Sequence, residues 1–248
     1  MEGELQRRDA ARTPRPICRV EWLGVEQDYQ ETWDLQRQIA AERLAGTRPD
    51  TLLLLEHAPT LTLGRAADVA HILATRDTLN AERISVVESD RGGDVTYHGP
   101  GQLVGYPILN LREPPHRADL HAYLRGIEEV LIRTVEAFGI PAGRFPGNTG
   151  VWTGLDTAAP KKVAAIGIKT GRWITQHGFA LNVTPNLAHF DLIVPCGIHD
   201  FGVTSLSLLR GREISVVETL PVVIAQFAAV FGLECVSGEG IARDASEL

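Results

Sequence analysis

The chain has 248 residues, of which 44% are apolar and 22% are charged, enough to bury a substantial core. Its formal net charge of −7 argues against a nucleic-acid partner, because neutralising phosphates requires a basic stripe. No apolar run approaches the roughly 20 residues that span a bilayer, so we expect no membrane partner. The three cysteines are too few for a disulfide framework, which indicates a reducing compartment and a cytoplasmic protein.

The N-terminal third predicts a tail followed by mixed strands and helices. Residues 1–16 are polar and without periodicity, so we expect a flexible tail and a single domain over residues 17–248. From there we predict a strand, an amphipathic helix, a buried strand closed by the turn around Pro59, and that strand's hairpin partner, at residues 17–23, 29–44, 51–56 and 61–64.

The rest of the chain predicts two long helices and a hairpin. The apolar periodicity of residues 119–138 indicates a helix that Asp119 caps and Gly139 ends. Two strand-like runs between residues 163 and 183 flank a polar turn at residues 169–172. Residues 215–231 suit a second helix if Pro221 lies in its first turn. We therefore expect an α+β domain of mixed β-sheets flanked by helices, with room for a small subregion after Pro195.

Residues 91–102, RGGDVTYHGPGQ, hold the densest group of unusual residues in the chain. Glycine has no Cβ, so the four glycines of this segment let backbone approach a ligand closely. The segment lacks the Gly-Lys-Ser/Thr ending of a phosphate loop, and no Gly-x-Gly-x-x-Gly opens a helix, so no motif indicates nucleotide binding. The residues alone are equally consistent with a glycine-rich hairpin loop in which His98 is a structural histidine.

Four runs together indicate a family. RGGDVTYHGPGQ resembles the signature of lipoyl(octanoyl) transferases, and KVAAIG, TQHGFALN and PCGI are similar to that family's other blocks in the same order. The resemblance implies the fold of biotin and lipoate protein ligases. It also implies an acyltransferase that moves an octanoyl group from octanoyl-acyl carrier protein to a lysine of a lipoyl domain, without a cofactor or metal. The implied acceptors are the lipoyl domains of the glycine cleavage H protein and of 2-oxoacid dehydrogenase E2 subunits.

The same resemblance assigns roles to individual residues. Cys196 of PCGI falls where the family carries its acyl group, and Lys162 of KVAAIG falls where the cysteine's partner lysine lies. The substrate-contacting segments that it implies are Arg91, Gly92, Gly93, Asp94, Val95, Thr96, Tyr97, His98, Ala165, Ile166, Gly167, Gly178, Phe179 and Ala180.

A cysteine and a lysine suit thioester chemistry. A free thiol with a pKa near 8.5 is mostly protonated at neutral pH, and an adjacent ammonium favours the thiolate. Cys196 lies in a sharply turned Pro-Cys-Gly setting, whereas we expect Cys18 and Cys235 to be structural. Backbone N–H groups near Gly167 or Gly197 are candidates to hold the oxyanion.

The second half of the reaction needs a base and a dry tunnel. The acceptor lysine attacks as a neutral amine, so Lys162, or less readily His98, would take its proton. We expect an acyl tunnel lined by Tyr97, Gly99, Ile166, Phe179 and Leu181, although core packing explains the last three equally well.

Three other functions stay open at this stage. An ATP-dependent lipoate–protein ligase would share the fold but needs no catalytic thiol. A cysteine hydrolase would use water as the acceptor, with His98, His177 or His199 as its base. A non-catalytic acyl-binding module would tolerate the replacement of Cys196.

Overall fold

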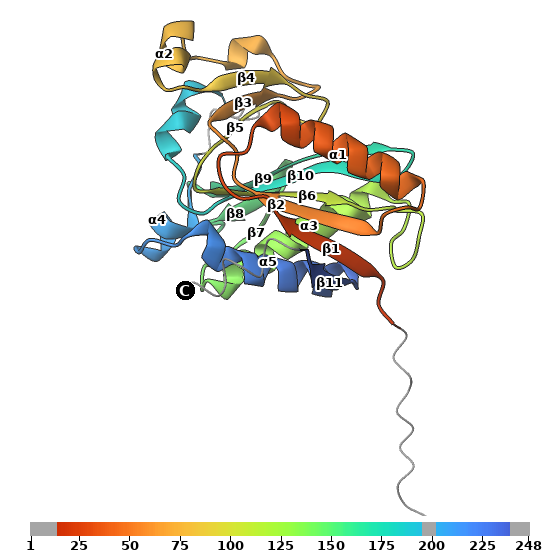
Figure 1. The fold of residues 1–248 in the computed structure, drawn as a ribbon. Coiled ribbons are helices and arrows are strands. Elements are labelled where there is room, and N and C mark those ends of the chain that lie inside the picture. Colours follow the sequence, from red (N-terminus) through yellow and green to blue (C-terminus); the bar gives the residue numbers. More distant parts are fainter. Residues whose placement is uncertain (1–13, 195–201, 239–248) are drawn as a thin grey trace, which may run out of the picture.

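The computed structural model describes residues 14–194 and 202–238, and its strands form two mixed sheets (Figure 1). The main sheet has eight strands in the order β11-β1-β2-β6-β10-β9-β8-β7, and a smaller sheet has the order β4-β3-β5. The strands are β1 (Ile17–Trp22), β2 (Asp50–Leu55), β3 (Thr60–Leu63), β4 (Ser85–Glu88), β5 (Val95–His98), β6 (Gln102–Ile108), β7 (Gly143–Phe145), β8 (Asn148–Thr153), β9 (Lys161–Gly171), β10 (Ile174–Asn182) and β11 (Glu234–Ser237).

Helices cover both faces of the main sheet, which confirms the predicted α+β class. Figure 1 shows α1 above one face, and α3 and α5 below the other. In the part of the chain that the structure describes, no helix has both the length and the apolarity to cross a membrane. The helices are α1 (Tyr29–Leu44), α2 (Arg76–Ala81), α3 (Leu120–Ala137), α4 (Leu206–Arg210) and α5 (Val216–Phe231), with 3₁₀ turns η1 (Val69–His71) and η2 (Leu187–Leu192).

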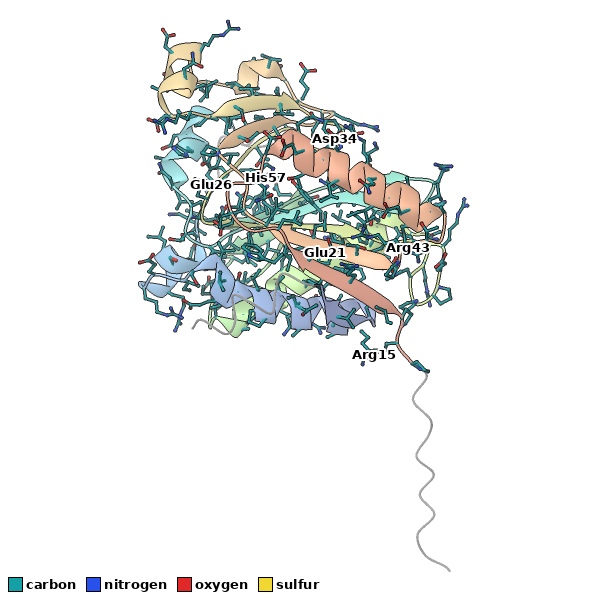
Figure 2. The ribbon with its side chains drawn as sticks, viewed as in Figure 1. Arg15, Glu21, Glu26, Asp34, Arg43 and His57 are labelled. Carbon is teal, nitrogen blue, oxygen red and sulfur yellow. The ribbon has the colours of Figure 1, made fainter. Side chains whose placement is uncertain are left out.

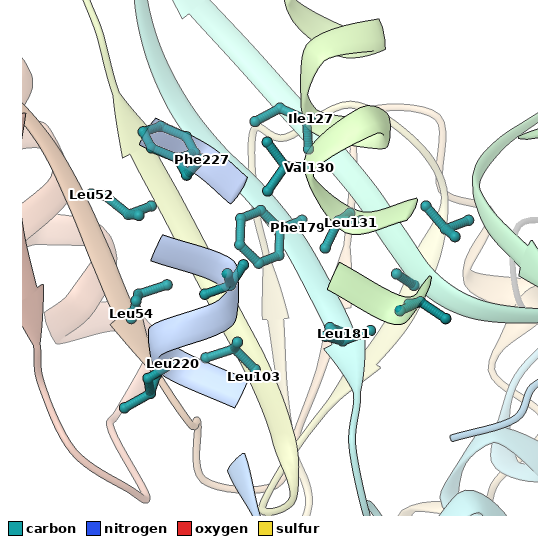
Figure 3. Close-up of a cluster of buried hydrophobic side chains, with 14 of the residues drawn as sticks. Leu52, Leu54, Leu103, Ile127, Val130, Leu131, Phe179, Leu181, Leu220 and Phe227 are labelled. Carbon is teal, nitrogen blue, oxygen red and sulfur yellow. The ribbon is translucent and has the colours of Figure 1, made fainter. Parts of the chain in front are cut away.

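The largest core lies between the main sheet and the pair α3 and α5. Phe179 of β10 points into it and meets Val130 and Leu131 of α3 (Figure 3). Leu220 and Phe227 of α5 close the same cluster. A second cluster on the opposite face packs α1 against β2 and β6. Because the main sheet is buried on both faces, it is a rigid floor for anything bound above it.

Contacts at both ends hold α1 in place. The Asp28 side chain accepts a hydrogen bond from the Glu31 amide at 2.9 Å and so caps the helix start. At the other end, Arg43 Nε donates to Asp50 Oδ1 at 2.7 Å, and both side chains are buried. Figure 2 shows Arg43 at this end of α1 and His57 near the opposite end. The predicted helix over residues 29–44 is therefore confirmed, and its position is fixed from both termini.

The strand at residues 60–63 does not pair with β2, so the predicted hairpin is wrong. β3 instead lies between β4 and β5 in the small sheet. Both edges of β2 are already occupied, by β1 and by β6. The turn around Pro59 therefore leads the chain out of the main sheet.

Two further predictions of detail are also corrected. β9 continues to Gly171, so the hairpin turns at Arg172 and Trp173, whose φ angles of 54° and 70° fit a two-residue turn with left-handed residues. Pro221 lies inside α5 and past its first turn, because a capping box of Ser215 and Glu218 fixes the helix start at Val216.

The other predicted elements follow the sequence closely. Asp119 caps α3, and Gly139 has a φ of 71° just after the helix, as its role at the helix end requires. The segment after Gly202 forms no separate subregion among the described residues, because α5 packs on α3 and β11 pairs with β1. Cys18 and Cys235 face each other in that pairing, the first buried and the second half-buried.

Gly105 gives a test of how tightly this sheet is packed. It lies opposite Phe179 in the β6–β10 pairing, and an added Cβ would stand 2.1 Å from the end of the Phe179 ring. We expect Gly105→Ala to lower the free energy of unfolding by about 1–3 kcal/mol, as overpacked cores do. Urea denaturation measures this loss. In the Gly105→Ala background, Phe179→Leu should cost less than it does alone, whereas simple additivity would contradict the proposed clash.

Candidate active site

A narrow cavity lies between the main sheet and the small sheet. Its volume for the centres of water-sized molecules is about 50 Å³, several times the roughly 10–15 Å³ that one water needs. β9 and β10 form its floor, the glycine-rich segment forms one wall, and the start of α1 reaches its rim. The lining residues are Tyr29, residues 91–96, His98, Tyr106, residues 165–167 and residues 177–180.

The cavity depends on glycines that let backbones touch. The Gly92 amide donates to the Ile168 carbonyl at 3.0 Å, which joins the glycine-rich segment to β9. A Cβ on Gly167 would lie 2.9 Å from the Gly92 oxygen, and one on Gly178 would lie 2.2 Å from the Gly105 oxygen. Larger residues at these positions would push the wall or the neighbouring strand away.

Arg91 holds the glycine-rich segment against the small sheet. The side chain is 7% exposed, and its Nε donates to Thr62 Oγ1 at 3.0 Å while Nη2 donates to the Thr62 carbonyl at 2.6 Å. Its Nη1 donates back to the Gly92 carbonyl at 3.0 Å. This guanidinium therefore shapes the wall of the cavity from β3.

Three residues predicted for an acyl tunnel do not line the cavity. Tyr97 points to the other side of β5, where its hydroxyl is 2.7 Å from His189 Nδ1 and its ring packs on Phe190. Side chains alternate along a strand, so the neighbouring Thr96 and His98 face the cavity instead. Gly99 lies outside the lining, and Leu181 belongs to the main core.

Three lining residues were absent from the predicted substrate-contacting set: Tyr29, Tyr106 and His177. Two tyrosines in amphipathic or apolar runs carry no sequence signal that separates them from core residues. His177 did carry one, because it directly precedes the Gly-Phe-Ala run of the predicted set. Regular alternation along β10 would place His177 on the face opposite Gly178. Its φ of 55° instead turns it into the cavity that Gly178 also lines.

The histidines beside the cavity are neutral. His57 Nδ1 donates to the Gln27 carbonyl at 2.9 Å, so its Nε2 accepts the Tyr106 hydroxyl at 2.7 Å. Burial lowers the pKa of His57 to about 4. Burial also lowers the pKa of His98 well below its ordinary value, with a further contribution from nearby His57 and Arg91.

A hydrogen-bonded chain leads from His98 to the strand that carries Lys162. His98 Nδ1 donates to Gln102 Oε1 at 2.8 Å, and Gln102 Nε2 donates to Asn182 Oδ1 at 2.9 Å. The amide of Asn182 donates to the Thr204 carbonyl at 3.1 Å, and the Thr204 amide donates to the Lys162 carbonyl at 3.0 Å. Because Nδ1 of His98 carries the proton in this series of hydrogen bonds, its Nε2 keeps a lone pair.

Lys162 lies in β9 beside the segment that resumes at residue 202. Its amide donates to the Gly202 carbonyl at 3.0 Å, and its ammonium lies 4.9 Å from the centre of the Trp152 ring. Cys196, Gly197 and His199 lie outside the described residues, as do residues 1–13 of the predicted tail. Cys196 is six positions before Gly202 in the sequence, and Gly202 accepts the Lys162 amide.

Comparison with known proteins identifies the class. The model of the lipoyl protein ligase A/B catalytic domain matches residues 28–228, and the chain belongs to this family. A bipartite lipoate protein ligase from Thermoplasma acidophilum shares the fold with a TM-score of 0.70 at 16% identity, covering 94% of this chain and 92% of that one. Lipoate-protein ligase A bound with ATP gives a TM-score of 0.67 at 17% identity, covering 93% of each chain.

Curated relatives narrow the class to acyltransferases. The octanoyltransferase of Chloroflexus aurantiacus is 50% identical over 216 residues, which cover 87% of this chain and 94% of the relative. The octanoyltransferase of Gloeobacter violaceus is 48% identical over 211 residues, covering 85% of this chain and 89% of the relative.

The neutral histidines predict how stability changes with pH. The pKa of His57 and of His177 is about 4 in the folded protein, below the ordinary 6.5, so the unfolded chain binds more protons between these values. We expect the free energy of unfolding to fall by a few kcal/mol as the pH drops from about 6.5 to 4. His57→Gln should show a shallower fall. Denaturant titrations at several pH values measure both, and equal stability at pH 7 and pH 4.5 would contradict the prediction.

Proposed function

We propose that this chain is an octanoyltransferase that moves an octanoyl group from octanoyl-acyl carrier protein to a lysine of a lipoyl domain. The observation that carries the proposal is the identity of about half the residues with octanoyltransferases over most of both chains. The cavity supports it, because residues 165–167 and 178–180 give a narrow, mainly apolar floor that suits an alkyl chain.

In the first half-reaction the Cys196 thiolate attacks the thioester carbonyl of the donor. A tetrahedral oxyanion forms, the bond to the carrier's sulfur breaks, and the octanoyl group remains on Cys196 as a thioester. The leaving thiolate takes up a proton from the Lys162 ammonium, which leaves this lysine neutral for the second half-reaction. The step replaces one thioester by another, so its free energy change is small and it needs no ATP.

Lys162 is the proposed partner that favours the Cys196 thiolate. Its place beside residues 202–204 supports this role, because these residues follow Cys196 by only six to eight positions in the sequence. An ammonium near a thiol stabilises the charged form and lowers the thiol pKa.

In the second half-reaction the acceptor lysine attacks the Cys196 thioester as a neutral amine. The C–S bond breaks, an amide forms, and the amine proton must leave. Lys162 is the proposed proton carrier. His98 is a further candidate, because it is neutral and its Nε2 has a lone pair on the cavity side of β5.

The proposed acceptors are the lipoyl domains of the glycine cleavage H protein and of 2-oxoacid dehydrogenase E2 subunits, in the cytoplasm. One solved structural neighbour supports an acceptor of this kind, since it is described as part of an archaeal lipoylation system with its E2 lipoyl domain.

Intact-mass measurement tests the nucleophile. We expect incubation with octanoyl-acyl carrier protein, without ATP, to add one octanoyl group to the wild type and to Cys235→Ala, but none to Cys196→Ala. Cys235→Ala is the matched control, because it also removes one free thiol but at a half-buried position distant from Cys196 in the sequence. An adduct that persists in Cys196→Ala would overturn the assignment, and a strict need for ATP would favour a lipoate ligase.

The alkylation of Cys196 by iodoacetamide tests Lys162. Lys162→Ala should move the midpoint of the rate-against-pH profile upward, because the thiolate loses its ammonium partner. Lys161→Ala is the matched control, since this neighbouring side chain is exposed. Peptide mass spectrometry follows the rate at Cys196. Identical profiles for the two variants would remove Lys162 from this role.

A further inference from the structure

Three side chains, His177, Asp90 and Lys169, form a wall that links the lining of the cavity to that of a second hollow. His177 lines the cavity, whereas Lys169 lines a groove of about 230 Å³ between α1 and the β9–β10 hairpin. Both side chains bind the same carboxylate: His177 Nε2 donates to Asp90 Oδ1 at 2.9 Å, and Lys169 Nζ pairs with Asp90 Oδ2. The groove is lined by apolar residues such as Leu44 and Ile174 and by polar ones such as Arg37 and Arg172.

His177 is a buried residue with a strained backbone and one ring nitrogen without a hydrogen-bond partner. It is 1% exposed and adopts a φ of 55°, a left-handed conformation that costs energy for a residue with a side chain. Its amide donates to Gln36 Oε1 of α1 at 2.8 Å. Its Nδ1 is buried without a hydrogen-bond partner. Strain and an unpaired polar atom in one buried residue indicate a functional position.

The wall stands at the end of the cavity that is remote from Lys162. In the β9–β10 register, Ala180 faces Ala165 and His177 faces Ile168. At about 3.3 Å per residue, the three steps from Ala165 to Ile168 span ~10 Å. An extended octanoyl chain has seven C–C bonds, and bonds of ~1.5 Å in a zigzag advance ~1.3 Å each, giving ~9 Å in total. The floor between these levels therefore matches an eight-carbon chain.

We infer that His177 is the end wall that sets the length of acyl chain the cavity accepts, and that Asp90 positions its imidazole. This inference rests on the proposed function, because it takes the cavity as the acyl site. A chain longer than eight carbons would meet the imidazole and, behind it, the charged pair of Asp90 and Lys169. Without the imidazole, the space that it fills at the end of the cavity would be free for extra methylenes.

The experiment compares carrier protein loaded with octanoyl, decanoyl and dodecanoyl groups. The chosen variant is His177→Gly, since glycine adopts a positive φ without strain. We expect the ratio of kcat/KM for dodecanoyl over octanoyl to rise at least tenfold over that of the wild type, because single methylenes change discrimination by about 10-fold or more. Asp90→Ala should raise the ratio in the same direction. Asp90→Asn should leave it near the wild-type value, because an amide oxygen still accepts from Nε2.

Ile168→Ala is the matched control. Ile168 pairs with His177 in the register but packs against the main core on the other face of the sheet. We expect it to lower stability without changing the chain-length ratio. A merely structural role for His177 would give His177→Gly and Ile168→Ala the same ratio as the wild type.

The outcomes separate this inference from the proposed function. A folded His177→Gly that transfers octanoyl with an unchanged ratio overturns the end wall and leaves the octanoyltransferase intact. If His177→Gly does not fold, Asp90→Ala decides, and an unchanged ratio there overturns the inference. A wild-type protein that transfers no octanoyl group refutes the proposed function itself.

Discussion

The close approach of the glycine-rich segment to β9 and β10 is the constraint on which the rest of the site depends. Gly92 reaches the backbone of Ile168, and Gly167 and Gly178 leave no Cβ between the layers. The resulting space is narrow because backbone, rather than long side chains, forms much of its surface. The main sheet can serve as this floor because α3 and α5 pack firmly beneath it.

The electrostatics differ along the cavity. The buried histidines His57 and His98 stay neutral because burial denies a charged ring the hydration that it would have in water. At the remote end, Asp90 carries charge in a pair with Lys169, and this pairing together with His177 lowers the pKa of the carboxyl despite partial burial. In the proposed reaction, an alkyl chain therefore passes the neutral histidines and the mainly apolar floor before it reaches this polar wall. Lys162, the ammonium of the proposed reaction, lies near the opposite end of β9.

Local patterns in the chain predicted its helices well. Asp119 and Gly139 bracket α3, and the period of residues 29–44 predicted α1 to the residue, because caps and amphipathic repeats act within a few positions. The same locality explains the errors. Residues 60–63 have a strand-like composition, but their pairing partner depended on which edges of β2 other strands had already occupied. The hairpin turn moved to Arg172 because the long pairing of β9 with β10 extends the strands beyond the polar segment.

The candidate site was also only partly predictable from the sequence. The residues from Arg91 to His98, and the runs after Lys162 and His177, were predicted from the sequence because they resemble the blocks of a known family. Their meeting around one cavity was not readable, since it requires two sheets and a helix that are distant in sequence. Tyr97 turned away and Tyr106 turned inward because strand alternation and neighbouring strands set the faces. The family resemblance in the sequence thus named most of the lining residues. Long-range packing decided which faces they present, added Tyr29, Tyr106 and His177, and closed the end of the cavity.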